Sequence, residues 1–231
     1  MANIINIETS TDVCSVALTG DCSVLADFSN PGGRNHAELL AGFTQKALDA
    51  AREQQRTIDA VAVSIGPGSY TGLRIGLSQA KGLAYALGVP LIGVPTLQIL
   101  ATSVMFNHHS IGLETRFAPM LDARRMEVYS AVYDMWLHPL LDPQPLILSA
   151  DSYAELLDQG ELLFMGNAVD KARTVITHPN ARWVEGVTPL ASDMLALSEK
   201  AFRANQFIDV AYSVPEYLKE FQTSAPRKRL F

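Results

Sequence analysis

A strand, a glycine-rich loop and a helix with one side-chain-poor face follow one another in the first half of this chain. Residues 61–65 are a β-branched run typical of a strand, and glycines cluster in the loop at residues 66–72. In the helix that we predict over residues 72–87, small residues recur at every fourth position: Gly72, Gly76, Ala80 and Ala84. A glycine inside a helix costs about 0.5–1 kcal/mol relative to alanine, so close approach of another backbone is the natural compensation. That backbone belongs either to the same domain or to a second chain, and the pattern leaves both open.

Hydrophobic patterning predicts alternating strands and helices around this segment. In the N-terminal half we expect strands at 4–7, 14–18, 24–28, 61–65 and 91–94, and helices at 35–53, 72–87 and 97–106. Asn35 and Glu38 form a capping-box pattern at the start of the first helix. This order implies a mixed sheet with helices on its faces.

The C-terminal half has fewer predicted helices and longer loops. We expect strands at 117–121, 127–134 and 162–165, a short helix opened by Ser152 and Glu155, and a longer helix at 190–204. The chain therefore divides into an N-terminal unit at 1–108, a reduced unit at 109–212 and a tail at 213–231. The helix at 190–205 is free to pack back onto the first unit.

Composition and charge exclude several classes of protein. The 231 residues are 48% hydrophobic, enough for a real core, and two cysteines are too few for a disulfide scaffold. The net charge of −6 argues against a nucleic-acid-binding surface over the chain as a whole. No run approaches the ~20 apolar residues of a membrane span, and residues 1–20 lack a secretory signal. We therefore expect a cytoplasmic protein that does not bind a membrane.

Three segments carry groups that suit a phosphate. The glycine loop precedes a helix N-terminus, where free amides favour an anion, yet its spacing fits neither standard phosphate motif. Residues 8–12 are hydroxyl-rich and lie between two strands. At a comparable hairpin, Asp122 stands close to Arg124 and Arg125. On the residues alone, the alternatives are tight structural turns and a surface ion pair.

Patterns for metals and nucleophiles are missing from the sequence. No two histidines have the i, i+4 spacing of a helical zinc site; they are His36, His108, His109, His138 and His178. Cys14 and Cys22 have no further pair, and Ser69 lacks a G-x-S-x-G elbow. The basic cluster at 227–229 suits either contact with RNA or a solvated chain end.

Four blocks, in order along the chain, resemble the TsaB/YeaZ family. The first is Ile7-Glu8-Thr9-Ser10-Thr11 with 14–18, and the second is 66–76 continuing through 80–97. The third is 122–125 with 127–129, and the fourth is 215–218, so the resemblance covers essentially the whole chain. It implies an α/β, actin-like ATPase fold (ASKHA or RNase H-like) with two related lobes, the second reduced.

In that fold phosphates lie between a hairpin of each lobe. The resemblance thus makes six residues remnants of a phosphate site: Glu8, Thr9, Ser10, Thr11, Asp122 and Arg124. The catalytic relative TsaD is expected to bind ATP and a metal through an H-x-x-x-H helix. This chain has Pro95-Thr96-Leu97-Gln98 at that place, without a histidine. The resemblance therefore implies a subunit with no catalytic residue, no metal and no cofactor of its own, with ATP or ADP confined to an interface with the partner.

The resemblance also implies partners. These are TsaD and the small ATPase TsaE, with a homodimer when they are missing, in an assembly that transfers threonylcarbamoyl to adenosine 37 of tRNA (t6A modification). Contact with the tRNA would be indirect, through the complex. The two helices after His36 and after the glycine loop would supply the interface, through His36, Leu40, Phe43, Leu73, Gly76, Leu77 and Ala80.

From this interface we expect Gly76→Leu to leave a folded monomer that binds neither TsaD nor itself. The alternatives to a scaffold subunit are an independent actin-fold ATPase or phosphotransferase and a glycoprotease-like peptidase. The missing histidines and nucleophile argue against the peptidase.

Overall fold

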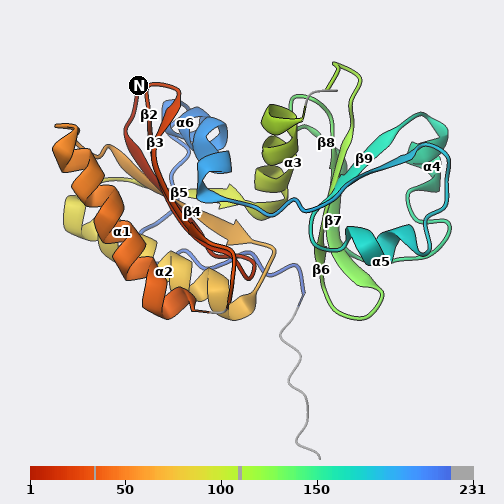
Figure 1. Cartoon of the computed structure of the whole chain (residues 1–231), viewed down its shortest axis with the longest axis horizontal. Coiled ribbons are helices and arrows are strands. Elements are labelled where there is room, and N and C mark those ends of the chain that lie inside the picture. Colours follow the sequence, from red (N-terminus) through yellow and green to blue (C-terminus); the bar gives the residue numbers. More distant parts are fainter. Residues whose placement is uncertain (34, 109–110, 220–231) are drawn as a thin grey trace, which may run out of the picture.

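Two five-stranded sheets form the framework of the computed structural model, which describes residues 1–33, 35–108 and 111–219 (Figure 1). In the first sheet the strand order is β3-β2-β1-β4-β5. The first three strands form an antiparallel meander, and the last two extend the sheet in parallel with β1. The strands are β1 (Ile4–Glu8), β2 (Cys14–Gly20), β3 (Ser23–Asn30), β4 (Ala60–Gly66) and β5 (Leu91–Pro95).

The second sheet repeats this topology strand for strand. Its order is β10-β9-β6-β7-β8, with β6 in the central place of β1, β7 and β8 completing the meander, and β9 and β10 parallel. The strands are β6 (Phe117–Asp122), β7 (Glu127–Tyr133), β8 (Pro139–Ile147), β9 (Leu162–Met165) and β10 (Ala181–Val184). Two lobes of one topology make an actin-like ATPase fold, which confirms the predicted α/β class and architecture.

Alternating side chains on the first sheet build a core on each face. Ile5 and Ile7 pack beneath α1 (His36–Glu53) and α2 (Tyr70–Leu87), whereas Ile4 faces the other side. That side is covered by α3 (Thr96–Asn107) and by α6 (Leu195–Arg203), which contacts β1 and β5. Since α3 also packs on β6 and β7, it belongs to both lobes (Figure 1).

The second lobe is reduced in its helices and not in its sheet. Its helices α4 (Ala154–Asp158) and α5 (Val169–Arg173) have five residues each, against 18 in α1 and in α2. Such short helices cover less of the sheet, and the core beneath them is completed by Leu148, Tyr153 and Trp183. Among the described residues, the structure has no helix both long and apolar enough to cross a membrane.

Three elements of the second lobe were not predicted: β8, β10 and α5. β8 holds Pro139, Pro143 and Pro145, which mask a strand pattern, and it is an edge strand that pairs only with β7. β10 and α5 are too short to show a period. The helix expected at 190–204 is a 3₁₀ turn, Ala191–Met194, followed by α6.

The helix ends correct two details. Asn35 precedes α1 but its side chain makes no capping bond, so the expected capping box is not formed. α2 begins at Tyr70 and not at Gly72, because Ser69 Oγ accepts a hydrogen bond from Gly72 N at 3.2 Å. Gly88 ends α2 in a left-handed conformation, with a φ of 67°.

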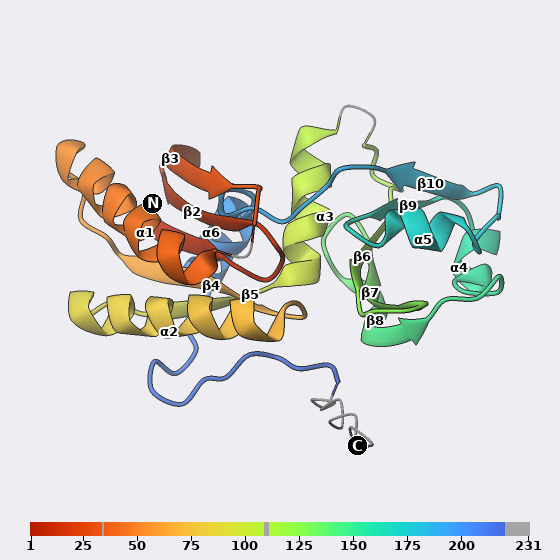
Figure 2. The ribbon, with the colours of Figure 1, turned by 60° about the horizontal axis from the view of Figure 1, so that its bottom comes forward.

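After α6 the chain returns along the first lobe as a C-terminal strap, residues 204–219. Figure 2 shows it passing beneath α2 toward the second lobe. Ile208 N donates to Leu91 O at 2.8 Å, and Lys81 Nζ donates to the carbonyls of Ala211 and Ser213 at 3.0 and 2.6 Å. The strap is therefore bound to the first lobe through its own backbone N–H and C=O groups.

Candidate functional site

The turn after β1 is buried beneath the start of α2. Thr9 Oγ1 donates a hydrogen bond to Gly72 O at 2.8 Å, and Ser69 N donates to Ser10 O at 2.6 Å. Thr11 Oγ1 accepts from Val13 N at 3.3 Å within the same turn. The structure thus brings the hydroxyl-rich segment and the glycine loop together, through the Thr9 hydroxyl and the Ser10 carbonyl.

Two positions of α2, Gly72 and Gly76, have no room for a side chain because this turn lies against them. A Cβ placed at Gly76 would lie 2.1 Å from Thr9 Oγ1, and one at Gly72 would lie 2.1 Å from Thr9 O. Gly68 meets Ser10 O in the same way, at 2.4 Å. The backbone that approaches the small-residue face therefore belongs to the same lobe. This corrects the prediction that Gly76→Leu leaves the monomer folded.

Glu8 ends β1 with its carboxyl inside the lobe. It is fully buried, and its Oε1 accepts a hydrogen bond from Ser10 N. Burial raises the pKa of Glu8 to about 7, against the opposing effect of hydrogen bonds from Ser10 and Ser64. A carboxyl held in this way faces the protein interior, so in this conformation it does not present a charge to a ligand between the lobes.

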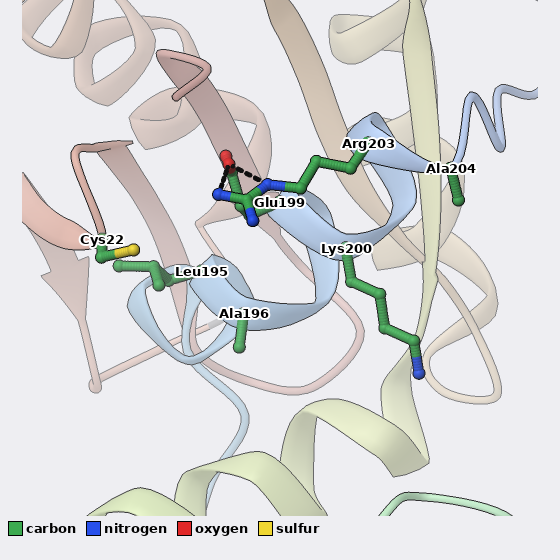
Figure 3. Close-up of a pocket in the computed structure, with 7 residues that line it drawn as sticks. All are labelled: Cys22, Leu195, Ala196, Glu199, Lys200, Arg203 and Ala204. Carbon is green, nitrogen blue, oxygen red and sulfur yellow. Dashed lines mark hydrogen bonds and ion pairs between the residues drawn. The ribbon is translucent and has the colours of Figure 1, made fainter.

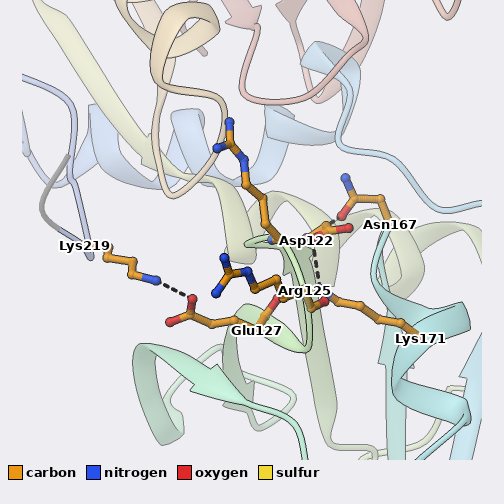
Figure 4. A network of polar contacts seen from close by, with 7 residues as sticks. Asp122, Arg125, Glu127, Asn167, Lys171 and Lys219 are labelled. Atoms are coloured by element: carbon orange, nitrogen blue, oxygen red, sulfur yellow. Dashed lines mark hydrogen bonds and ion pairs between the residues drawn. The ribbon is translucent and has the colours of Figure 1, made fainter. Parts of the chain in front are cut away.

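Lys171 of α5 organises the turn between β6 and β7 (Figure 4). Its Nζ donates to Asp122 Oδ1 at 2.9 Å, to Arg125 O at 3.0 Å and to Glu127 O at 2.5 Å. Asn167 Oδ1 accepts from Asp122 N at 2.8 Å. Partial burial alone would raise the pKa of Asp122, but the hydrogen bond from Lys171 outweighs it and lowers the pKa.

The two arginines of this turn do not pair with Asp122. Only the backbone N of Arg124 reaches Asp122 Oδ1, at 2.6 Å, and Lys171 takes the place of the expected arginine partner. Arg124 and Arg125 are exposed, and both have left-handed φ angles, 74° and 51°. Lys171 is a residue that the sequence pattern missed, since α5 lies about 45 residues further along the chain.

The C-terminal strap contacts the glycine loop and the β6–β7 turn. Glu216 N donates to Ile65 O at 2.7 Å beside the glycine loop, and Arg74 Nε donates to Tyr217 OH at 3.0 Å. Lys219 then forms an ion pair with Glu127 of the second lobe (Figure 4). The strap thus links the glycine loop to the β6–β7 turn.

Most residues predicted for a partner interface lie in the core. Leu40, Leu73, Leu77 and Ala80 are buried, and Phe43 is partly buried against Phe28. His36 is buried too, with its Nε2 3.2 Å from Val13 O. Because these side chains hold α1 and α2 to the sheet, the structure corrects their assignment as surface contacts.

The outer surface of these helices carries a different set of small residues. Gly42 in α1 and Gly82 in α2 are exposed, and a Cβ at either would meet nothing within 4 Å. Ala41, Ser78 and Ala86 are exposed as well. α1 and α2 lie side by side, so these residues form one surface, called here the outer helix face (Figures 1 and 2). The spacing of these small residues is visible in the sequence, but only their exposure in the structure distinguishes this face from the buried inner face.

An open depression beside α6 is a weaker candidate (Figure 3). It is lined by Cys22, Leu195, Ala196, Glu199, Lys200, Arg203 and Ala204. Glu199 and Arg203 are paired there at 2.7 Å, so few polar groups are free to orient a ligand. Within the described ranges no cluster of three His, Cys, Asp or Glu side chains could hold a metal. His109 and the basic cluster at 227–229 lie outside those ranges.

The chain is similar to known proteins over nearly its whole length. A family model described as TsaD, tRNA N6-adenosine threonylcarbamoyltransferase, matches residues 29–228. The chain is 30% identical over 226 residues to the tRNA threonylcarbamoyladenosine biosynthesis protein TsaB of Escherichia coli, covering 94% of both proteins. The chain belongs to the TsaB/YeaZ family.

Other relatives of this TsaB/YeaZ member support the same assignment. The structure of YeaZ from Pseudomonas aeruginosa matches with a TM-score of 0.79 and 28% identity, over 94% of this chain and 100% of that one. A tRNA N6-adenosine threonylcarbamoyltransferase of Clostridium botulinum is 38% identical, but only over 108 residues, which are 40% of this chain and 32% of the enzyme. The similarity to that enzyme is therefore partial, whereas the similarity to TsaB and YeaZ extends over nearly the whole chain.

Proposed function

We propose that this chain serves tRNA threonylcarbamoyladenosine biosynthesis in the cytoplasm as a non-catalytic docking subunit. Its partner is a TsaD-type protein, joined by TsaE, and the assembly transfers threonylcarbamoyl to adenosine 37 of tRNA. Without that partner the same surface binds a second copy of the chain. The names of its curated relatives support the pathway.

The exposed glycines of the outer helix face carry the docking proposal. Each of Gly42 and Gly82 lies inside an 18-residue helix with open space above it. Such a glycine costs about 0.5–1 kcal/mol relative to alanine, and none of the described residues lies close enough to either glycine to compensate for it. A partner helix that packs against the bare backbone would compensate for this cost, because it gains close contacts that any side chain would prevent.

Residues of the predicted phosphate site support the absence of catalysis. The Thr9 hydroxyl donates a hydrogen bond to Gly72 O, and Glu8 is buried. α3 begins with Thr96, Leu97 and Gln98, so no histidine stands where TsaD is expected to bind its metal. We propose that the chain needs no cofactor of its own and that ATP or ADP binds only at the interface with the partner. Purified chain should then hydrolyse ATP at the background rate until the TsaD-type protein is added.

Gly82→Arg tests the docking surface. The new side chain has room in the monomer, so the thermal midpoint should stay within a few degrees of the wild type. It stands where a partner helix must approach, so binding of the TsaD-type protein from the same organism should fall by at least tenfold in calorimetry. Cells that carry only the variant should lose t6A from their tRNA, as measured by nucleoside analysis.

Gly112→Arg is the matched control, since a Cβ on Gly112 also has no described residue within 4 Å and Gly112 lies outside both helices. It should bind the partner like the wild type. Equal affinities for the two arginine variants would refute docking through the outer helix face. Normal t6A in cells depleted of the chain would refute its role in the pathway.

A further inference from the structure

We propose that the β6–β7 turn binds RNA, with the guanidinium groups of Arg124 and Arg125 contacting backbone phosphates of the tRNA. This inference rests on the proposed function, because it gives this chain a direct part in holding the substrate of the assembly. The family resemblance implied only indirect contact with the tRNA.

Charge balance at the turn leaves these two arginines available. Asp122 is paired with Lys171, and Glu127 with Lys219. Within the part of the chain that the structure describes, neither Arg124 nor Arg125 has a carboxylate partner. The turn thus carries two uncompensated positive charges in a chain whose net charge is −6. Guanidinium groups bind phosphate oxygens in bidentate fashion, which suits them to a nucleic-acid backbone.

The backbone of the turn is unfavourable for arginine. Both residues have left-handed φ angles, a conformation that glycine adopts freely and that L side chains rarely adopt. Lys171 holds this conformation through its bonds to the carbonyls of Arg125 and Glu127. Residues in such conformations cluster at sites where their side chains are used. A turn that served only to connect two strands would be more stable with Asn and Gly.

The turn and the glycines of the outer helix face lie on different lobes. The turn is at the end of β6 and β7 in the second lobe, whereas Gly42 and Gly82 lie in α1 and α2 of the first lobe, of which only the start of α2 approaches the second lobe (Figures 1 and 2).

The test compares two double variants that remove the same charge from the same lobe. Arg124→Asn/Arg125→Gly removes the proposed contacts and relieves the backbone, so its thermal midpoint should equal or exceed that of the wild type. Arg173→Ala/Arg182→Ala is the control, since both residues are exposed and pair with glutamates elsewhere on the lobe. Binding of unmodified tRNA is measured for the full chain, alone and with the TsaD-type protein, between 50 and 200 mM salt.

The turn variant should bind tRNA at least tenfold more weakly than the wild type. Its plot of log affinity against log salt should be shallower by about 1.4–1.8, the contribution of two phosphate contacts. The control should match the wild type in tRNA affinity and in the slope against log salt. Equal tRNA binding by the turn variant and the control would overturn the inference, as would a wild-type chain that adds nothing to tRNA binding in either setting.

Two further arms separate this inference from neighbouring ones. Titration with ADP distinguishes a nucleotide from an RNA backbone: a turn variant that loses ADP binding but keeps tRNA binding overturns the RNA assignment. Partner binding is measured by pull-down with the same proteins. A turn variant that docks normally yet loses tRNA binding supports the inference. A wild-type chain that binds tRNA through the arginines but does not dock supports it as well, and removes the proposed function alone.

Discussion

Thr9 determines the side-chain-poor face of α2 at the scale of single residues. Its carbonyl and hydroxyl lie where a Cβ on Gly72 or Gly76 would be, and its hydroxyl donates to Gly72 O. Gly82 follows Gly76 along the same helix but has open space around it. The two glycines therefore have opposite roles, one in folding and one on the surface.

Alanine at these two glycines should change stability in opposite directions. Gly76→Ala pushes a methyl group into Thr9 and should lower the free energy of unfolding by about 1–3 kcal/mol. Gly82→Ala removes a helix glycine without a clash and should raise it by about 0.5–1 kcal/mol. Urea unfolding of both variants checks this, and shifts of the same sign would contradict it.

Glu8 links stability to pH. Burial raises its pKa from 4.5 to about 7, so between those values the folded chain binds the proton more tightly than the unfolded chain. The stability that this proton contributes is complete below pH 4.5 and is lost as the pH rises through about 7. Glu8→Gln cannot ionise and lacks this dependence. From pH 5 to pH 8 the free energy of unfolding of the wild type, measured in urea, should fall by about 2–3 kcal/mol relative to that of the variant. Parallel curves of unfolding free energy against pH would argue against a raised pKa of Glu8.

At the scale of elements, the C-terminal strap depends on the glycine loop. Gly66 has a φ of 121°, and a Cβ there would lie 2.6 Å from Glu216 O. Its neighbour Ile65 accepts the hydrogen bond from Glu216 N. The strap can therefore lie against the end of β4 only because residue 66 has no side chain.

Gly66→Ala should release the strap and leave the lobes folded. Chymotrypsin should then cleave at Tyr212 and Tyr217 several-fold faster than in the wild type. Gly88→Ala is the control, because Gly88 is also left-handed, with a φ of 67°, but has nothing within 4 Å. Equal cleavage rates for both variants would show that the strap is held independently of the loop.

Predictability of the elements followed their length and periodicity. The long helices and the buried strands of the first lobe show clear periods, and the ends of their predicted ranges agree with the structure to within two residues. β8 escaped prediction because three prolines interrupt it on a sheet edge, and α5 because five residues show no period. Since α5 carries Lys171, the network around the β6–β7 turn could not be predicted either.

At the scale of the whole molecule, the repeated strand order makes the two lobes equivalent in topology while their surfaces differ. The first lobe has two long helices that form the outer helix face, and the second has short helices and an arginine-bearing turn. α3 packs into both cores and joins them. The proposed docking and RNA contacts thus fall on different lobes of one connected body.

The sequence by itself determined the fold class, the two-lobe architecture and the family, because hydrophobic period and ordered motifs are local properties of the chain. It also showed that some backbone must approach α2. Only the tertiary structure decided that this backbone is Thr9 of the same lobe and that Gly42 and Gly82 face outward. The physical reason is that a helix repeats small residues in the same way on a buried and on an exposed face. What lies against each face depends on residues that are distant along the chain.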